Sequence, residues 1–389
     1  MFRAWPLGRL AAWYGRKINF GFYLKNCNGG ANKIMAKIEF KFSRSSVNRA
    51  GSALISSNVA EQDLAKDILD NWRACHVSPL NSFQTSLRKK LKKIDNNALV
   101  SQRLKRTPSI IAKLKRNPKM NLCRMQDVGG IRAVVSNMSE VRKLEQSYKK
   151  GTRVFLIEKG GKDYINYPKS SGYRSVHKVF KCKNGFSVEL QIRTKIQHAW
   201  ATAVETMGTF LDHSLKSSEG PDEWLEFFSL ASSAFAVLES TPRIPSFEDL
   251  SDQETFELLL AKEKELDVLN KLSGFRVVAK HITDDNRKGK YHLITLDLDR
   301  KMANIQSYSA ANIELANQEY SKKEEEVSMG RNLQVVLVAS DSISALKKAY
   351  PSYFLDSQNF SKQIELVRKK LDKMKSPRTM KKRAAKIRF

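Results

Sequence analysis

The chain has 389 residues and a formal net charge of +29, with 69 Lys and Arg residues against 40 Asp and Glu. Apolar residues make up 41% of it, which is enough for two or three domains with real cores. No apolar run reaches the ~18 residues of a membrane-spanning helix, and the four cysteines form no CxxC pattern or Cys/His cluster. These features exclude a membrane span, a structural zinc site and a disulfide scaffold, and we expect a cytoplasmic protein.

The positive charge is concentrated in three segments. Residues 1–38 carry 7 basic and no acidic residues, residues 86–125 carry 13 and 1, and residues 368–389 carry 11 and 1. These segments account for the whole net charge, so the rest of the chain is neutral. Such concentration predicts a polyanionic partner, such as nucleotide phosphates, RNA or an acidic surface.

Residues 1–34 are basic, free of acidic residues and rich in aromatics. An organellar transit peptide or a basic arm has a similar composition. We favour translated upstream sequence, because Met35 opens a more ordinary segment. We expect this extension to be disordered.

A mixed pattern of helices and strands follows. Helical spacing of apolar residues begins after Asn58, and a second amphipathic helix with a basic polar face is expected at 80–95. Apolar, β-branched or alternating runs predict strands, and a long helix follows them. The strands are expected at 131–135, 153–158, 175–182 and 186–193, and the helix at 195–215. This order predicts an α/β (α+β) domain with a mixed sheet over residues 35–245.

The C-terminal part reads as a second, smaller α+β domain. Prolines at 242 and 245 mark a boundary near 243–252, after a helix at about 222–239. Helices at 255–273 and about 311–327, and strands at 275–282, 291–298 and 333–339, are expected in residues 250–367. Residues 368–389 form a basic tail, and the function of this part is not legible from its residues.

Residues 103–116 (RLKRTPSIIAKLKR) combine cations with a helix start. Thr107 suits an N-cap and Pro108 the first helical position. A helix N-terminus flanked by Arg103 and Lys105 is a ready site for phosphate, and Lys113 lies further along. A solvated basic face is the alternative reading.

Two carboxylates lie in or beside predicted strands. Asp127 precedes Gly129 and Gly130 in MQDVGGIRAVV, and Glu189 lies on the polar face of SVELQIRT with Gln191 and Arg193. If the strands are neighbours, the carboxylates converge and would hold Mg²⁺ that bridges nucleotide phosphates. The alternatives are a turn Asp that caps local amides and a solvent-exposed Glu–Arg pair.

The segment KDYINYPKSSGYRSVH alternates cations with tyrosines in a loop. Aromatic rings provide flat faces for a nucleotide base, and cations serve its phosphates. The alternative for these tyrosines is packing, and a lone His177 is more often structural than catalytic.

Taken together and in this order, the motifs resemble the synthetase domain of the RelA/SpoT alarmone synthetases, over roughly residues 58–240. The resemblance implies a mixed five-stranded sheet flanked by helices. It also implies Mg²⁺-dependent transfer of the β,γ-pyrophosphate of ATP to a ribose 3′-hydroxyl, usually that of GTP or GDP. We see no HDxxED-type metal-hydrolase motif, so hydrolysis of alarmones is not expected.

The resemblance also assigns roles residue by residue. Tyr173 would stack on the acceptor base, and Glu189 would activate the 3′-hydroxyl. The full set is Arg103, Lys105, Ser109 and Lys113 for ATP; Asp127 and Glu189 for Mg²⁺ and catalysis; and Lys162, Lys169, Tyr173, His177, Gln191 and Arg193 for the acceptor.

Two other functions stay open. Some stand-alone relatives resemble toxins that pyrophosphorylate the 3′ end of tRNA, and some carry a fused neutralising domain. The basic helix at 86–94 and the basic tail suit tRNA, and an acidic helix near 314–326 could cover the basic surface at rest. From another class, the chain could be an inactive RNA-binding module, although the presence of both Asp127 and Glu189 argues against decay of the site. Small relatives often assemble, so a homo-oligomer is also expected.

Overall fold

The computed structural model describes residues 39–376, apart from 150–153, 212–214, 216–217, 273–280, 285–288, 298, 301 and 340–356. Contacts divide the chain into Met1–Met35 and Ala36–Phe389, and all described residues belong to the second unit. The expected extension at 1–34, part of the strand expected at 275–282 and the end of the basic tail lie outside the described residues. Within the described part, no helix is both long and apolar enough to cross a membrane.

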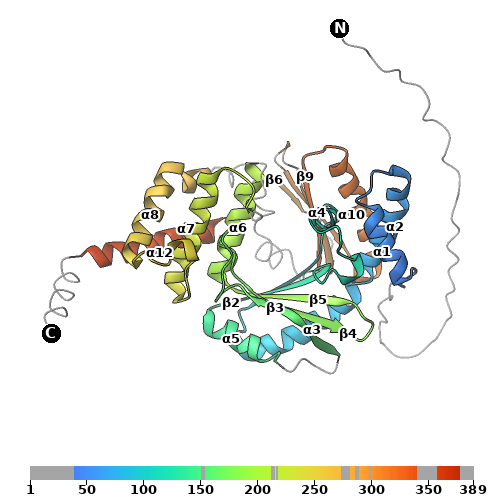
Figure 1. Cartoon of the computed structure of the whole chain (residues 1–389), viewed down its shortest axis with the longest axis horizontal. Coiled ribbons are helices and arrows are strands. Elements are labelled where there is room, and N and C mark those ends of the chain that lie inside the picture. The colour runs from blue at the N-terminus through green and yellow to red at the C-terminus, as the bar shows by residue number, and fades with distance from the viewer. Residues whose placement is uncertain are drawn as a thin grey trace, which may run out of the picture. The chain divides into compact units, whose positions relative to one another are not determined.

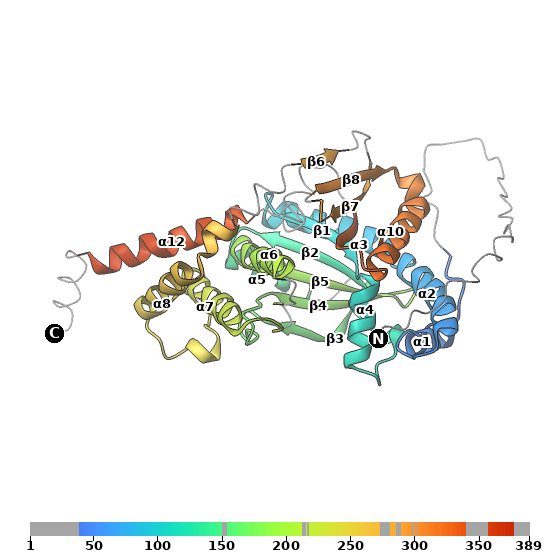
Figure 2. The ribbon, with the colours of Figure 1, turned by 90° about the horizontal axis from the view of Figure 1, so that it is seen from above.

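The centre of this unit is one nine-stranded sheet in the order β3-β4-β5-β2-β1-β9-β7-β8-β6 (Figure 2). The pairs β2–β5 and β6–β8 are parallel and the other neighbours are antiparallel, so the expected mixed sheet flanked by helices is confirmed. The strands are β1 (Leu99–Leu104), β2 (Gly129–Val135), β3 (Phe155–Asp163), β4 (Val176–Cys182), β5 (Ser187–Thr194), β6 (His281–Asp284), β7 (Tyr291–Asp297), β8 (Met302–Tyr308) and β9 (Leu333–Ala339).

The alternation of β5 decides which face of the sheet can hold a site. Val188, Leu190 and Ile192 are fully buried against α3 (Val77–Ile94), in the same core as α5 (Met138–Gln146). Figure 1 shows α3 and α5 on one side of the sheet and α6 (Lys195–Phe210) on the other. The polar residues of β5 therefore face away from the α3–α5 core, as a period of two requires.

A separate hydrophobic cluster joins the first two helices of the described chain to the helix that follows β1. Helix α1 (Arg44–Ala53), α2 (Val59–Ala74) and α4 (Thr107–Arg116) pack through a core that includes Trp72 and Ile110. Helix α4 begins one residue earlier than expected, because Arg106 is the N-cap and Thr107 is already helical. Pro108 then stands at the second helical position, where its missing N–H costs no hydrogen bond.

Four helices share a third core. These are α6, α7 (Asp222–Glu239), α8 (Asp252–Leu266) and α12 (Gln358–Lys375). Thr194 and Gln197 form a capping box that starts α6, and Ser251 and Glu254 form one that starts α8. Residues 368–375 of the basic tail therefore belong to a docked helix, since Phe360, Val367 and Leu371 of α12 are buried.

The C-terminal strands continue the same sheet. The strands β2, β3, β4 and β5 correspond to the four expected from their sequence patterns, β1 was not predicted, and β9 extends the sheet by pairing with β1 at Gln102↔Ala339 and Arg103↔Val338. Helix α10 (Ile313–Ser328) packs on β7 and β9. The remaining short helices are η1 (Leu122–Arg124), η3 (Pro245–Phe247) and η4 (Ala310–Asn312). The part after residue 250 is thus joined to the N-terminal strands through a shared sheet and a shared helical core.

Candidate active site

Asp127 holds two of the cations expected to bind ATP. Its Oδ2 lies 2.8 Å from Lys105 Nζ, and its Oδ1 lies 2.8 Å from Lys113 Nζ. Lys105 directly follows β1, where its amide donates to the Val128 carbonyl at 2.8 Å, while Lys113 reaches back from α4. Burial alone would raise the pKa of Asp127, but the two lysines outweigh it and hold that pKa below its ordinary value.

Glu189 belongs to a closed ring of hydrogen bonds. His177 Nδ1 and Glu189 Oε1 are 2.8 Å apart, and His177 Nε2 is 2.8 Å from the Tyr173 hydroxyl. Arg193 Nη2 donates to the Tyr173 hydroxyl and to Gln191 Oε1, both at 3.1 Å. Gln191 Nε2 closes the ring by donating to Glu189 Oε2 at 2.8 Å. Because each carboxylate oxygen can accept more than one hydrogen bond, Glu189 retains capacity for a substrate hydroxyl.

The electrostatics of this ring favour an ionised Glu189. Burial alone would raise its pKa, but hydrogen bonds from His177 and Gln191 hold that pKa below the ordinary value. Burial alone would lower the pKa of His177, but Tyr173 and Glu189 outweigh it and raise that pKa. The negative charge of Asp127 acts on Glu189 in the opposite sense, so the two carboxylates interact through space.

The register of the sheet places the two carboxylates in or beside neighbouring strands. Strand β2 runs parallel to β5 with Gly130 opposite Glu189, and Asp127 lies just before β2. The strands β2 and β5 are therefore neighbours, which is the condition for the two carboxylates to converge. On the other side of β5, His177 of β4 lies opposite Gln191, which brings two more members of the ring together.

This pair of carboxylates fits a magnesium ion better than a metal held by protein ligands alone. Among the described residues, no group of three or more His, Cys, Asp or Glu side chains gathers to hold a metal. Mg²⁺ is usually held in proteins by one or two carboxylates, with waters and substrate phosphates supplying the other oxygens. Asp127 and Glu189 are of that type.

The aromatic loop between β3 and β4 presents rings and cations together. Lys169 Nζ lies 4.8 Å from the Tyr164 ring centroid and 5.5 Å from that of Tyr173, and Lys162 Nζ lies 6.0 Å from that of Tyr164. Both lysines are exposed, whereas Tyr173 is half-buried. The loop thus brings aromatic rings and exposed cations together.

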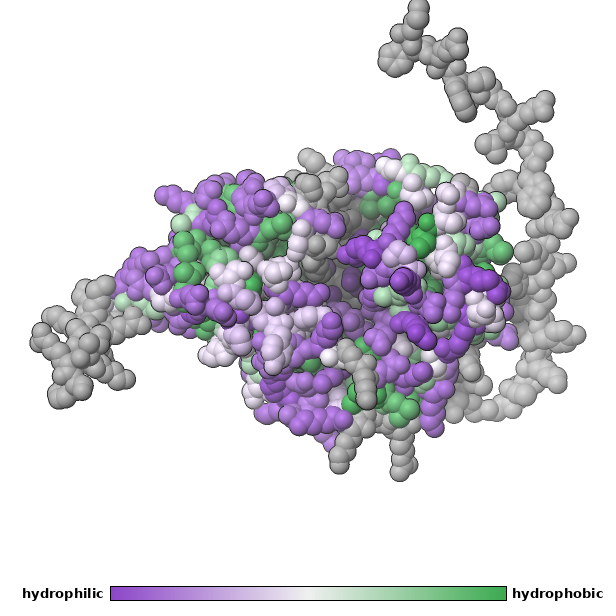
Figure 3. Space-filling model, viewed as in Figure 1, coloured by the Kyte–Doolittle hydropathy of each residue, from purple (hydrophilic) through white to green (hydrophobic). Residues whose placement is uncertain are grey.

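Two expected donor residues lie beside the Asp127 cluster. Arg103 is the penultimate residue of β1 and lies opposite Gly130, and Ser109 lies half-buried in the first turn of α4. Figure 3 shows strongly hydrophilic surface over α4, bordering a hollow in the face that it presents. The twelve expected residues lie on β1, on α4 and the segment that leads into it, just before β2, on β5, and on the aromatic loop with its flanking strands.

Sequence reasoning missed Arg73, a buried residue of α2 that contacts the start of α4. Arg73 Nε donates to the Lys105 carbonyl at 3.1 Å, and Nη1 donates to Thr107 Oγ1 at 2.8 Å. A cation in the last turn of α2 carries no local signal for this role, because the groups at the start of α4 that it contacts lie more than 30 residues away.

Arg73 also contacts Glu324 of α10, within the acidic helix expected near 314–326. Glu324 Oε2 lies 3.4 Å from Arg73 Nη1, and Glu324 Oε1 accepts from the Thr107 amide at 3.0 Å. Tyr320 donates to the same carboxylate, and the Arg73 guanidinium lies 5.0 Å from the Tyr320 ring centroid. Figures 1 and 2 both show α10 beside α4 and α2. A carboxylate of the C-terminal part thus occupies the helix N-terminus at which phosphate was expected.

Residues 102–209 match the family described as a region found in RelA / SpoT proteins. This range runs from β1 into α6, so it contains both carboxylates and the aromatic loop. The family resemblance read from the motifs is confirmed for this region.

The curated relatives are matched over less than half of their own length. The chain is 29% identical over 126 residues to an uncharacterized protein of Mycobacterium tuberculosis, covering 32% of this chain and 45% of that protein. It is 34% identical over 105 residues to a probable chloroplastic GTP diphosphokinase of Arabidopsis thaliana, covering 26% and 14%. The small alarmone synthetase 1 of Bacillus subtilis, solved with its product pppGpp, is 26% identical over 43% of this chain and 93% of that one, with a TM-score of 0.36. The chain therefore spans less than half the length of these two curated relatives.

Proposed function

We propose that the protein transfers pyrophosphate from ATP to the ribose 3′-hydroxyl of a guanine nucleotide, GTP or GDP, without alarmone hydrolase activity. The observation that carries this proposal is the pairing of two unlike centres on a RelA/SpoT region. One is Asp127 with Lys105 and Lys113, and the other is Glu189 in its ring of hydrogen bonds. Transfer of phosphoryl groups requires mainly positioning and charge neutralisation, and this arrangement offers both.

On the donor side, we propose that Arg103, Lys105, Ser109 and Lys113 bind the ATP phosphates. Mg²⁺ would be held by Asp127 and Glu189 and would neutralise charge on those phosphates. The two lysines now share one carboxylate, so they retain a net positive charge for the nucleotide. We expect their ammonium groups to move from Asp127 to phosphate oxygens when ATP binds.

On the acceptor side, Tyr173 would stack on the base, while Lys162, Lys169, His177, Gln191 and Arg193 would line the acceptor's phosphates and ribose. Glu189 takes the proton of the 3′-hydroxyl, and the 3′-oxygen forms a bond to the β-phosphorus of ATP. The bond from that phosphorus to the oxygen bridging the α-phosphate breaks, and AMP leaves. The pKa of Glu189 lies below its ordinary value, so the carboxylate is ionised at neutral pH, which is the protonation state that a general base requires.

Purified full-length protein with Mg²⁺ and γ-labelled ATP tests the proposal, with GTP, GDP or deacylated tRNA offered as acceptor. Label on GTP or GDP supports the leading function, and label only on tRNA supports the toxin-like alternative. If none of the three acceptors becomes labelled, pyrophosphate transfer is contradicted, and the remaining hypothesis is an RNA-binding module.

A specific contact favours one part of the toxin-like alternative, in which the C-terminal part neutralises the enzyme. Glu324 accepts the Thr107 amide and pairs with Arg73, so its carboxylate takes the place that a donor phosphate would use. Of the acidic residues on this helix, Glu319 and Glu326 instead pair with Lys322, Lys323 and Arg331 of the C-terminal part. We propose that Glu324 competes with ATP in the resting protein.

The test of this competition needs the whole chain. Strand β9 covers the edge of β1, and α12 packs on α6, α7 and α8, so deleting residues 250–389 would expose a strand edge and a core. A single substitution at Glu324 removes the charge and leaves β9 on the edge of β1 and α12 in its core.

The basic helix α3 supports an RNA partner less than its composition suggests. Lys89, Lys92 and Lys93 are exposed. Lys90, however, donates to the Ser147 carbonyl at 2.8 Å and lies 4.4 Å from the Tyr148 ring centroid. Part of this charge therefore holds α3 to the segment after α5.

A further inference from the structure

We propose that Ser232 of α7 is a positioning residue for Tyr173, because its hydroxyl ties down the two residues that flank that tyrosine. The identity of the ligand in this inference rests on the proposed function, whereas the contact itself rests on the structure. Ser232 lies outside the 102–209 range that matches the RelA/SpoT family.

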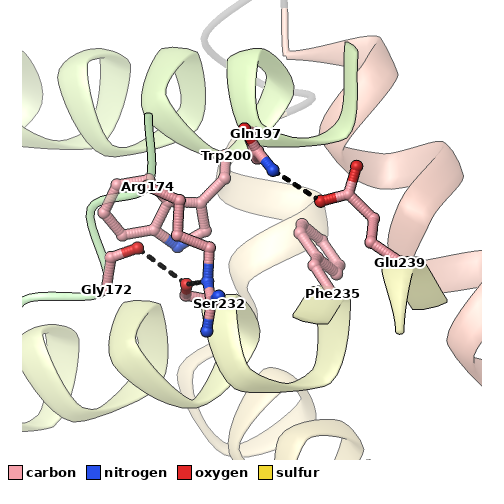
Figure 4. Close-up of a pocket in the computed structure, with 7 residues that line it drawn as sticks. All are labelled: Gly172, Arg174, Gln197, Trp200, Ser232, Phe235 and Glu239. Carbon is pink, nitrogen blue, oxygen red and sulfur yellow. Dashed lines mark hydrogen bonds between the residues drawn. The ribbon is translucent and has the colours of Figure 1, made fainter. Parts of the chain in front are cut away.

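One hydroxyl group makes both contacts. Ser232 Oγ donates to the Gly172 carbonyl at 2.7 Å and accepts from Arg174 Nε at 2.8 Å, as Figure 4 shows. Ser232 is 1% exposed, so water does not compete for these bonds. Since Gly172 and Arg174 stand on either side of Tyr173, the backbone that carries the ring is held to α7 at both ends.

The loop also lies directly against the two helices. Gly172 has a φ of +89°, and a Cβ atom there would lie 2.8 Å from Trp200 Cζ2 and 2.9 Å from Ser232 Cβ. Both the left-handed backbone and the lack of space therefore require glycine. Trp200 of α6 is itself held to α7, because its Nε1 donates to the Phe228 carbonyl at 2.7 Å. The loop thus packs against α6 and α7, two helices that are themselves joined by a hydrogen bond.

The surrounding polar groups serve the loop rather than a nucleotide. Arg174 is buried, and burial lowers its pKa to about 10 although Glu239 opposes this. Gln197 Nε2 donates to Glu239 Oε2 at 2.8 Å, so the carboxylate is fixed on the other side of the pocket (Figure 4). The space between these groups has room for about one water molecule, far too little for a base or a phosphate.

Tyr173 connects the position of this loop to the ring of hydrogen bonds around Glu189. Its hydroxyl contacts His177 at 2.8 Å and Arg193 at 3.1 Å, which link it to Glu189. A loop that moves away from α7 would displace the stacking ring and one member of the hydrogen-bond ring together. The two hydrogen bonds of Ser232 thus form a clamp on the loop. The Asp127 cluster, whose members lie before β2, after β1 and on α4, is not part of this clamp.

The test compares Ser232→Ala with Ser233→Ala in the full chain. Ser233 is the next residue of α7, is also fully buried, and accepts from the Ile244 amide at 3.3 Å, outside the loop. We expect Ser232→Ala to raise the KM for the acceptor about tenfold and leave the KM for ATP unchanged, as loss of about one hydrogen bond of positioning predicts. Ser233→Ala should change neither KM. An equal effect of both variants, or a change in both KM values, overturns the inference.

Amide hydrogen exchange gives a second readout that needs no activity. Exchange at residues 164–174 should be faster in Ser232→Ala than in the unmutated chain and in Ser233→Ala. Ser232→Cys, which keeps a weak donor, should lie between. If exchange in this loop is unchanged in Ser232→Ala, the clamp is contradicted even if the protein catalyses transfer. If the wild-type chain transfers label to no acceptor, the proposed function is contradicted, and hydrogen exchange alone decides whether the clamp exists.

Discussion

The Thr107 amide of α4 lies 3.0 Å from the carboxylate of Glu324, a residue that follows it by more than 200 positions in the chain. A carboxylate at a helix N-terminus interacts favourably with the helix dipole and with the free N–H groups there. A phosphate group would make the same interactions. The C-terminal part therefore contributes a group that mimics the expected ligand.

Glu324→Gln should favour ATP binding. The amide keeps the shape but loses the charge that pairs with Arg73, so the competing contact weakens by about 1–2 kcal/mol. We expect the apparent Kd for ATP, measured by calorimetry, to fall by about tenfold. Glu325→Gln is the matched control, since that residue is exposed on the same helix. Equal affinity in all three proteins would show that Glu324 does not compete.

Asp127→Asn should abolish transfer while the fold is kept. The substitution removes the charge that would bind Mg²⁺ and leaves Lys105 and Lys113 without their carboxylate partner. A loss of at least about 10²-fold in kcat is expected in an assay of label transfer. ATP binding without Mg²⁺ should be unchanged or tighter, since both lysines are released. Retention of most activity would break the assignment of Asp127.

Glu189→Gln removes the expected general base and one of the two proposed Mg²⁺ ligands, and leaves the cations of the ATP site in place. We expect kcat to fall by about 10²–10⁴-fold, with a smaller rise in the KM for ATP from the weaker hold on Mg²⁺. The introduced amide would still bond within the ring, so thermal unfolding should occur near the wild-type midpoint. A large rise in the KM for ATP with unchanged kcat would instead place Glu189 in donor binding.

Asp95 predicts a dependence of stability on pH. Its Oδ1 accepts from the Asn97 amide at 2.9 Å and its Oδ2 from the Ser136 amide at 2.7 Å, which ties the end of α3 to the end of β2. Burial opposes ionisation, but these bonds hold the pKa of Asp95 below its ordinary value. The folded pKa is thus below the unfolded one, so the stabilisation is present above about pH 4 and is lost as the pH falls through the folded pKa.

Asp95→Asn should therefore lower the free energy of unfolding at pH 7 by about 1–3 kcal/mol. The difference from the unmutated chain should shrink as the pH is lowered below about 4. Thermal unfolding monitored from pH 7 to pH 3 measures this, with Asp249→Asn, at an exposed position, as control. A difference that does not change with pH would show that ionisation of Asp95 contributes nothing.

Local patterns in the sequence predicted the polar face of β5, because alternation with a period of two is set by the strand itself. The same reasoning placed Glu189, Gln191 and Arg193 together, and the structure shows them in one ring. Helix α2 begins at Val59, as its apolar spacing predicted, although Asn58 makes no side-chain cap hydrogen bond.

Contacts between distant segments could not be predicted in this way. The pairing of β9 with β1 and the approach of Glu324 to Thr107 depend on how the chain folds back, which no local pattern encodes. The clamp of Ser232 on the aromatic loop is of the same kind, since a serine inside an apolar helix reads as ordinary packing. The charge count was also ambiguous, because Lys90, Lys105 and Lys113 are engaged with neighbouring groups in the fold.

The most direct test of the proposed reaction is the fate of all three phosphates of ATP. ATP labelled separately at the α, β and γ positions would be incubated with the full-length protein, Mg²⁺ and GTP or GDP, and the products separated. Transfer of pyrophosphate predicts that β and γ label move together to the guanine nucleotide, while α label appears in an equal amount of AMP. Movement of γ label alone, with formation of ADP, would show a simple kinase and contradict the account.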